Sequence, residues 1–262
     1  MTLIIGIQCE DGIVLGADGA ATLGNSLGVR TVRQSVKKLT KIGHCVAIGT
    51  SGPVGLGQRF GNSLQKLWDD KKLSGKDSTE VTTILQREFW QFADLEFRTA
   101  QVTAPILGQQ AIESAISNTI VMMPIAKQAR LIQFNHQCSP ELATHDLPFV
   151  AIGSGQPLGD MFLAFLRRIF WKDHRPKVTE GVLATVWALT QAINTNTGGV
   201  SDPIQLMTLE KSNGDWQVKE LSEDDLSEHR QAINEAERLL GDFRAHMNPA
   251  SSDTDPPKPE SE

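Results

Sequence analysis

The chain has 262 residues, 40% hydrophobic and 21% charged, which are the proportions of an ordinary globular protein with a sizeable core. Its formal net charge of −6 disfavours a general nucleic-acid binder, which would need a basic face for phosphates. No run approaches the roughly 18 to 20 uncharged apolar residues of a membrane span, and the N-terminus lacks the basic segment of a secretory signal. We therefore expect a cytoplasmic protein with neither a nucleic-acid nor a membrane partner.

Strand-like and helix-like runs follow one another in separate blocks. The predicted elements, in chain order, are strands 2–9, 13–18 and 45–52, helices 55–70 and 78–101, strands 118–126, 129–135 and 147–155, helices 158–171 and 179–194, strands 203–211 and 215–222, and a terminal helix 223–243. Blocks of this kind indicate an α+β layered domain with antiparallel sheets. We expect one domain over residues 1–246. The Pro-, Ser- and acid-rich tail 247–262 is expected to be disordered because it has too little apolar surface to bury.

Cysteines and histidines give no sign of a metal site or a disulfide framework. Cys9, Cys45 and Cys138 are odd in number and far apart, so we interpret them as buried small apolar residues. The six histidines have no ligand spacing such as H-E-x-x-H. No metal is expected.

The opening hairpin places a hydroxyl and a carboxylate at one end of a sheet. An Asp-Gly pair between the first two strands is a strong hairpin signal, and paired positions summing to about 21 to 23 bring Thr2 within a few positions of Asp18. We expect Met1 to be removed, because the next residue is small. Thr2 would then carry an α-amine, with a pKa of about 7.7 to 8.0, able to act as a base for its own hydroxyl. Taken singly, Thr2 is also an ordinary strand former and Asp18 an ordinary strand-end acid.

Five sequence blocks together resemble a known family. They are "TLIIGIQCEDGIVLGADGAATLGN", "VKKL", "AIGTSGPVG", "AIGSG" and "NTNTGG". In this order they resemble the proteasome β-subunit family of N-terminal-nucleophile hydrolases, and "GADGAATLGN" resembles the bacterial HslV peptidase branch. The longer chain and the longer segment before "VKK" are similar to the betaproteobacterial proteasome homologue, which is our preferred placement. The ancestral bacterial β-subunit group, Anbu, is the alternative.

The resemblance implies a four-layer αββα sandwich, with two antiparallel sheets between helical layers, and a set of reacting residues. Thr2 falls on the catalytic nucleophile, Asp18 on the catalytic acid and Lys38 on the catalytic lysine. A lysine held near the hydroxyl by a carboxylate favours the alkoxide. Alternation along a strand lets only one of Lys37 and Lys38 point at Thr2, and the alignment of "VKKL" selects Lys38. From the residues alone, both lysines could equally be a solvated surface pair.

The same resemblance assigns supporting roles. Gly52 falls on the glycine whose backbone N–H is the oxyanion donor. Thr22 falls on the position whose backbone pairs with an extended substrate, and Gly52 and Val54 join it in substrate binding. Ser154 falls on the serine that supports the nucleophile's amine. The segment "GSGQPLG" does not match a phosphate-binding loop, since its spacing is G-x-G-x-x-x-G and no acidic ribose partner is evident.

Two positions depart from the family pattern. Asn194 and Thr197 in "NTNTGG" stand where the family usually carries an acid and a serine. Thr197 keeps a hydroxyl, whereas Asn194 loses a charge, which puts the polarisation of the amine in doubt. Because Thr2, Asp18 and Lys38 are all present, we still expect activity.

The resemblance therefore implies a self-compartmentalising threonine endopeptidase that needs no cofactor and acts on peptides or unfolded chains. It also implies a homo-oligomeric double ring, with two rings of seven subunits, or of six if the kinship to HslV is closer. Apolar stripes over 55–68 and 81–95 are candidates for the ring contact, with a core-facing role as the alternative. An ATP-dependent unfoldase would have to be another protein, since the chain has no P-loop. Two other functions stay open, an amidase acting on a small amide and a ring subunit without activity.

Overall fold

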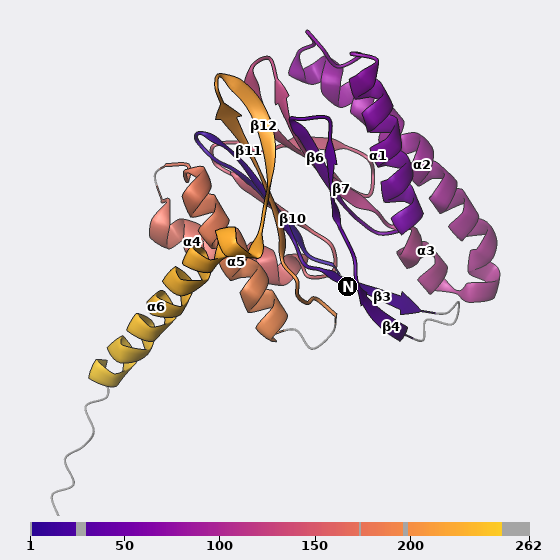
Figure 1. The fold of residues 1–262 in the computed structure, drawn as a ribbon. Helices are drawn as coiled ribbons and strands as arrows, with labels where there is room; N and C mark the ends of the chain where they lie inside the picture. The colour runs from indigo at the N-terminus through magenta and orange to yellow at the C-terminus, as the bar shows by residue number, and fades with distance from the viewer. Residues whose placement is uncertain (1, 25–29, 173, 196–198, 248–262) are drawn as a thin grey trace, which may run out of the picture.

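Four layers make up the fold (Figure 1). The computed structural model describes residues 2–24, 30–172, 174–195 and 199–247. Two five-stranded antiparallel sheets lie face to face, with α1, α2 and α3 over one of them and α4, α5 and α6 on the side of the other. The structure thus confirms the predicted αββα sandwich with two antiparallel sheets. Residues 248–262 of the predicted tail lie outside the described part of the chain.

The first sheet has the strand order β10-β1-β2-β11-β12. Its strands are β1 (Ile4–Gln8), β2 (Gly12–Ala17), β10 (Phe149–Ile152), β11 (Gln205–Ser212) and β12 (Asp215–Leu221). Ile4 pairs with Ala17 in the opening hairpin, which is the register that the Asp-Gly turn predicts. The N-terminal end of β1 therefore lies beside the C-terminal end of β2. Thr2 lies just before β1 and Asp18 just after β2, so the two residues are neighbours.

The second sheet has the order β5-β6-β7-β8-β9, and a separate two-stranded ribbon projects beside it. The strands of the sheet are β5 (Leu39–Ile42), β6 (Val46–Ser51), β7 (Asn118–Ile125), β8 (Gln128–Phe134) and β9 (Pro140–Leu142). The ribbon consists of β3 (Ala20–Gly24) and β4 (Arg30–Ser35). Strands β3, β4, β5 and β9 are not among the predicted elements, because they are short and lack a clear two-residue alternation of apolar and polar residues.

The described helices form two groups of three, one on each side of the pair of sheets. They are α1 (Val54–Asp69), α2 (Ser78–Leu107), α3 (Gln109–Ala115), α4 (Gln156–Phe170), α5 (Val178–Thr195) and α6 (Glu223–Met247). A capping box begins α2, since Asp77 accepts from the Glu80 N–H and Glu80 accepts from the Asp77 N–H. Within the described ranges, no helix is both long and apolar enough to cross a membrane.

Apolar side chains fill both the space between the sheets and the space beneath the helices. Under α1 and α2, the rings of Phe60, Phe89 and Phe134 meet edge to face or tilted, with centroids 5.2 to 6.5 Å apart. The apolar stripe of α1, including Leu56 and Leu64, is fully buried in this cluster. The core-facing interpretation of the stripe over 55–68 is therefore the right one, and the stripe is not available for a contact between rings.

Candidate active site

The β1–β2 hairpin brings Asp18 under the first residues of the chain. Its carboxylate is fully buried and accepts three backbone N–H groups. Oδ1 accepts from Leu3 at 2.9 Å, while Oδ2 accepts from Ala20 at 3.1 Å and from Ser201 at 3.3 Å. Backbone donors of this kind fix the orientation of the carboxylate. Asp18 is thus held as an oriented negative charge beside Thr2.

Lys38 joins this carboxylate to the hydroxyl of Thr2. Its Nζ lies 2.6 Å from Asp18 Oδ1 and 3.2 Å from Thr2 Oγ1, and its side chain is only 7% exposed. Burial lowers the pKa of Lys38, and the charge and hydrogen bond of Asp18 oppose that effect without cancelling it. Lys38 Nζ thus lies within hydrogen-bonding distance of both the buried carboxylate and the Thr2 hydroxyl.

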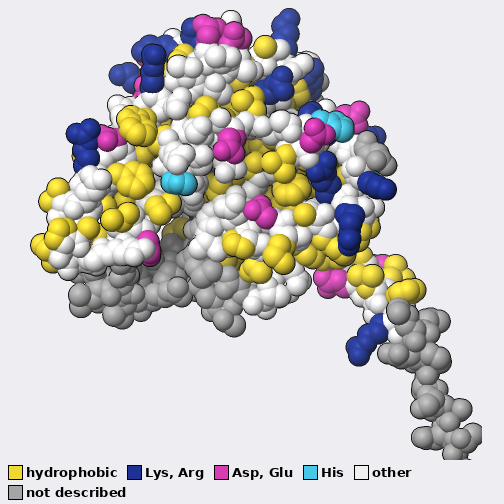
Figure 2. Space-filling view, turned by 180° about the vertical axis from the view of Figure 1, so that it is seen from behind, with side chains coloured by type: hydrophobic (Ala, Val, Ile, Leu, Met, Phe, Trp, Pro, Cys, Tyr) yellow, Lys and Arg dark blue, Asp and Glu magenta, His cyan; other side chains and the backbone are white. Residues whose placement is uncertain are grey.

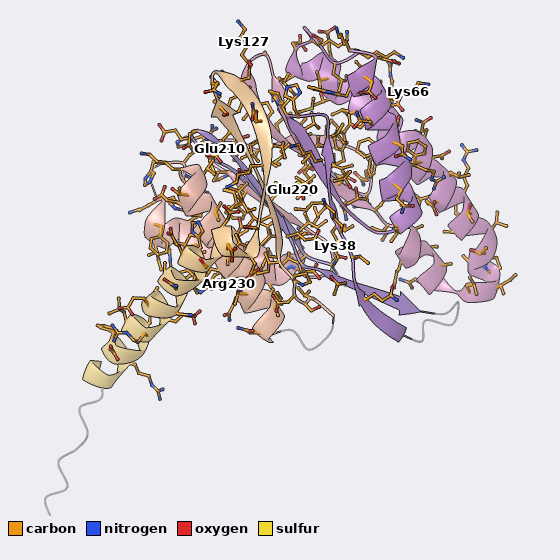
Figure 3. All side chains as sticks on the ribbon, viewed as in Figure 1. Lys38, Lys66, Lys127, Glu210, Glu220 and Arg230 are labelled. Atoms are coloured by element: carbon orange, nitrogen blue, oxygen red, sulfur yellow. The ribbon has the colours of Figure 1, made fainter. Side chains whose placement is uncertain are left out.

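Lys37 points elsewhere. Its Nζ forms an exposed ion pair with Glu220 at 2.9 Å. Figure 3 labels Lys38 near the end of the sheets that carries the N-terminus, and Glu220 farther along β12. Of the two neighbouring lysines, the structure thus turns the one selected by the "VKKL" alignment toward Thr2.

The backbone of Thr2 is fixed by the segment after β10. Thr2 N lies 3.1 Å from Ser154 Oγ, and Thr2 O accepts the N–H of Gly155 at 3.0 Å. Gly153 has φ of 95°, and a Cβ at this position would lie 2.2 Å from Thr2 O, so only glycine fits. With Met1 attached, Thr2 N is a peptide nitrogen, and loss of Met1 would turn it into an α-amine beside the serine hydroxyl.

The Thr2 hydroxyl faces an open cavity of about 720 Å³ between β5, β6 and the start of α1. Thr2, Lys38, Gly52 and Val54 are among its lining residues, and none of the described side chains that line it is a carboxylate. Gly52 has φ of 115°, and a Cβ there would lie 2.5 Å from the carbonyl oxygen of Ile116. The turn after β6 therefore requires glycine and presents bare backbone at the cavity.

The remaining predicted site residues are not brought to this cluster by any described contact. Asn194 is exposed on the last turn of α5, and no hydrogen bond between described residues joins it to Thr2 or Asp18. Thr197 lies outside the described residues. The backbone of Thr22 is paired with Arg33 in the β3–β4 ribbon, and its side chain is not described.

Sequence reasoning missed Ser201 and Gln205. The N–H of Ser201 donates to Asp18, and the side chain of Gln205 bonds to the backbone on both sides of Lys37. Each acts across more than 160 positions, so no local pattern marks it. Among the described residues, no group of three or more His, Cys, Asp and Glu side chains is placed to hold a metal ion.

A family model described as "Proteasome subunit" matches residues 2–199, which is most of the chain. The chain belongs to the proteasome subunit family. A similar curated protein is the "Proteasome subunit beta" of Methanocella paludicola, 28% identical over 94 residues. That alignment covers 35% of this chain and 44% of the relative.

Solved structures similar to this proteasome-family subunit include three Anbu proteins. The Anbu from Yersinia bercovieri has a TM-score of 0.68 at 14% identity, covering 99% of this chain and 100% of its own. An Anbu (Gly-1) mutant from Hyphomicrobium sp. strain MC1 has a TM-score of 0.66 at 18% identity, and the match covers 95% of this chain and 100% of the mutant's chain. A chain of the helical assembly of the Anbu complex from Pseudomonas aeruginosa has a TM-score of 0.66 at 16% identity, and the match covers 99% of this chain and 98% of that chain. At these identities the likeness shows the fold. These structures do not single out the betaproteobacterial homologue as the nearest branch.

Proposed function

We propose that this protein is a threonine-type endopeptidase whose nucleophile is Thr2, exposed by removal of Met1. The observation that carries the proposal is the position of Lys38 Nζ, 2.6 Å from a fully buried carboxylate and 3.2 Å from the Thr2 hydroxyl. An ammonium group so placed stabilises the hydroxyl oxygen as it loses its proton. The cavity beside this oxygen gives a substrate room to enter.

Proton transfer comes first in the proposed reaction. The α-amine of Thr2, near neutral in pKa, takes the hydroxyl proton directly or through a water molecule. Ser154 Oγ lies 3.1 Å from that nitrogen and orients it. Since Asn194 lacks the charge of the family's acid, we assign the orientation of the amine to Ser154.

The Thr2 oxygen then attacks the substrate carbonyl, and the negative charge develops on the carbonyl oxygen. The Gly52 N–H is the proposed donor to this oxygen. The amine returns its proton to the leaving nitrogen, which leaves an ester between Thr2 and the substrate. Water, activated by the same amine, hydrolyses the ester and restores Thr2. Side chains and backbone of the chain supply each of these steps.

Hydrolysis of fluorogenic peptides by the purified protein, together with its intact mass, tests the proposal. Peptides with a neutral or acidic residue before the cleaved bond are the first choice, because Lys37, Lys38 and Lys41 line the cavity and no described lining residue is a carboxylate. We expect cleavage by molecules that have lost Met1. Full retention of Met1 together with no cleavage would favour a family member without activity, and cleavage of small amides but not of peptides would favour an amidase.

We also propose that copies of the chain assemble so that Thr2 faces an enclosed chamber. Figure 2 shows apolar side chains gathered over both helical layers. On α4 they recur every three or four residues, at Leu158, Met161, Phe165 and Ile169, all exposed. A stripe of this spacing on one helix face suits packing against a second copy. Placement beside the betaproteobacterial homologue implies closed rings of seven and HslV implies rings of six, whereas the Pseudomonas Anbu assembly is helical.

Met161→Glu is expected to reduce the molar mass of this assembly. Met161 is 73% exposed in the single chain, so the added charge costs little in folding but would be buried in a contact between copies. Gln137→Glu, at an exposed position between β8 and β9 and outside both helical layers, is the control and should leave the mass unchanged. Light scattering with negative-stain averages reads both the mass and the symmetry. A wild-type monomer of 28.6 kDa with full peptidase activity would remove the chamber from the account.

A further inference from the structure

The short segment that carries Lys38 is held by a side chain from the other sheet. Residues 36–38 lie between the end of β4 and the start of β5, outside the pairing of either strand. The side-chain oxygen of Gln205, the first residue of β11, accepts the Lys38 N–H at 2.8 Å and the Leu39 N–H at 3.4 Å. Its amide nitrogen donates to the Val36 carbonyl at 2.5 Å. The side-chain amide of Gln205 thus supplies the hydrogen bonds that a neighbouring strand would otherwise give to this segment's backbone.

Gln205 begins the strand that pairs with β2, and Asp18 directly follows the end of β2. In the register of β11 with β2, Gln205 lies opposite Ala17, the residue before Asp18. Lys38 is therefore held at both ends from one sheet, with Asp18 at Nζ and Gln205 at the backbone nitrogen. We propose that Gln205 is a positioning residue that sets the distance between Lys38 Nζ and the Thr2 hydroxyl, an inference that rests on the proposed peptidase function.

Position matters here because the contact between Lys38 and Thr2 is already long, at 3.2 Å. Without Gln205, the backbone N–H of Lys38 and the carbonyl of Val36 lose their shared partner, and the bond from the Val36 N–H to the Gly19 carbonyl holds only the start of the segment. The backbone at Lys38 can then shift. A shift of about 1 Å would take Nζ out of hydrogen-bonding range of the hydroxyl, and misplacements of that size cost up to about a hundredfold in rate.

The chain offers a matched control in Gln8. Its side-chain oxygen accepts the Leu131 N–H at 3.0 Å, and its amide donates to the Ala129 carbonyl at 3.2 Å. It therefore also links the first sheet to the second, through β1 and β8, at the end remote from Thr2. Loss of either glutamine removes an inter-sheet link of the same kind, but only Gln205 is bonded to Lys38.

The test compares Gln205→Ala, Gln205→Glu and Gln8→Ala with the wild type in peptide hydrolysis and thermal unfolding. For Gln205→Ala we expect kcat to fall about tenfold to a hundredfold with KM within about twofold of wild type. Gln8→Ala is expected to keep its kcat even where its Tm falls. A kcat loss in Gln8→Ala equal to that in Gln205→Ala would show that general loosening of the sandwich, and not the placement of Lys38, is responsible.

Gln205→Glu adds a signature that a merely structural role would not give. One carboxylate oxygen of the new glutamate can still accept the Lys38 N–H. The other oxygen faces the Val36 carbonyl, which is also an acceptor, so a hydrogen bond forms there only when the carboxyl group is protonated. Two ion pairs between described residues share its surroundings, Lys37 with Glu220 at the surface and Lys38 with the buried Asp18. Lowering the pH from about 8 to about 6 should therefore raise kcat relative to wild type for Gln205→Glu and not for Gln205→Ala. Equal and flat ratios for the two variants would contradict the proposal.

Lysine footprinting with an N-hydroxysuccinimide ester keeps the inference separate from the peptidase proposal. Lys38 is nearly inaccessible in the wild type, so its acylation, measured by mass spectrometry, should rise severalfold in Gln205→Ala and not in Gln8→Ala. A rise in a protein that cleaves no peptide would leave the positioning role intact while the peptidase proposal fails. Unchanged Lys38 labelling together with unchanged kcat in Gln205→Ala would overturn the positioning role.

Discussion

Thr2→Ala is expected to reduce peptide hydrolysis by at least about 10³-fold, to the level of the blank. The substitution removes the oxygen that attacks the peptide carbonyl in the proposed reaction, while the α-amine and the cavity remain. Stability should change little, because the Thr2 side chain is partly exposed and its recorded partner is the Nζ of Lys38. Initial rates with a fluorogenic peptide, together with Tm and molar mass, measure the two effects separately.

Thr2→Ser is the matched variant for this substitution. Serine retains both the hydroxyl and the α-amine, so some turnover should survive. Activity that persists in a clean Thr2→Ala preparation would remove Thr2 from the mechanism. If Thr2→Ala failed to fold, its Tm would show this. The serine variant would then be compared with the wild type instead.

Lys38→Ala is expected to lower kcat by about 10²- to 10³-fold, the size of effect seen when one charge-stabilising donor is removed from an active site. Lys37→Ala should change kcat by less than about twofold, since Lys37 is 61% exposed and paired with Glu220 at the surface. Equal and mild losses in the two variants would show that the lysine role is wrongly assigned.

Removing Lys38 also leaves the buried Asp18 carboxylate without its cation, and a broken buried pair typically costs about 3 to 5 kcal/mol. Lys38→Arg addresses this problem because arginine keeps the positive charge beside Asp18. Its planar guanidinium cannot reproduce a single ammonium placed 2.6 Å from one group and 3.2 Å from the other. We therefore expect Lys38→Arg to fold with near wild-type Tm and to lose most of its kcat.

Local patterns in the sequence were sufficient for the long elements and for the register that matters most. The Asp-Gly turn placed Thr2 beside Asp18, and the observed pairing of Ile4 with Ala17 agrees with it. Helix α2 was predicted to end at 101 but continues to Leu107 through Pro105, because propensity near a helix end is a weak guide. The polar β3–β4 ribbon had no apolar alternation to reveal it.

The candidate site depended more on resemblance than on pattern. Alternation could say that only one of two adjacent lysines faces Thr2, but not which one, and the family alignment chose Lys38. The hydrogen bond from the Ser201 N–H to Asp18 and the bond between Gln205 and the Lys38 N–H are tertiary contacts between distant segments. Such contacts follow from how β2, β5 and β11 come together, which single-sequence periodicity does not contain.

The central claim is that Thr2, with a free α-amine, is the nucleophile. An epoxyketone peptide reagent requires both the hydroxyl and the amine of one N-terminal residue, so its adduct reports the two groups together. After incubation of the full-length protein and proteolytic digestion, mass spectrometry of the N-terminal peptide should show a chain beginning at Thr2, increased by the mass of the reagent. Peptide hydrolysis should fall in parallel with the formation of this adduct. An unmodified peptide that still begins at Met1, found in protein that cleaves peptides at full rate, would contradict the account.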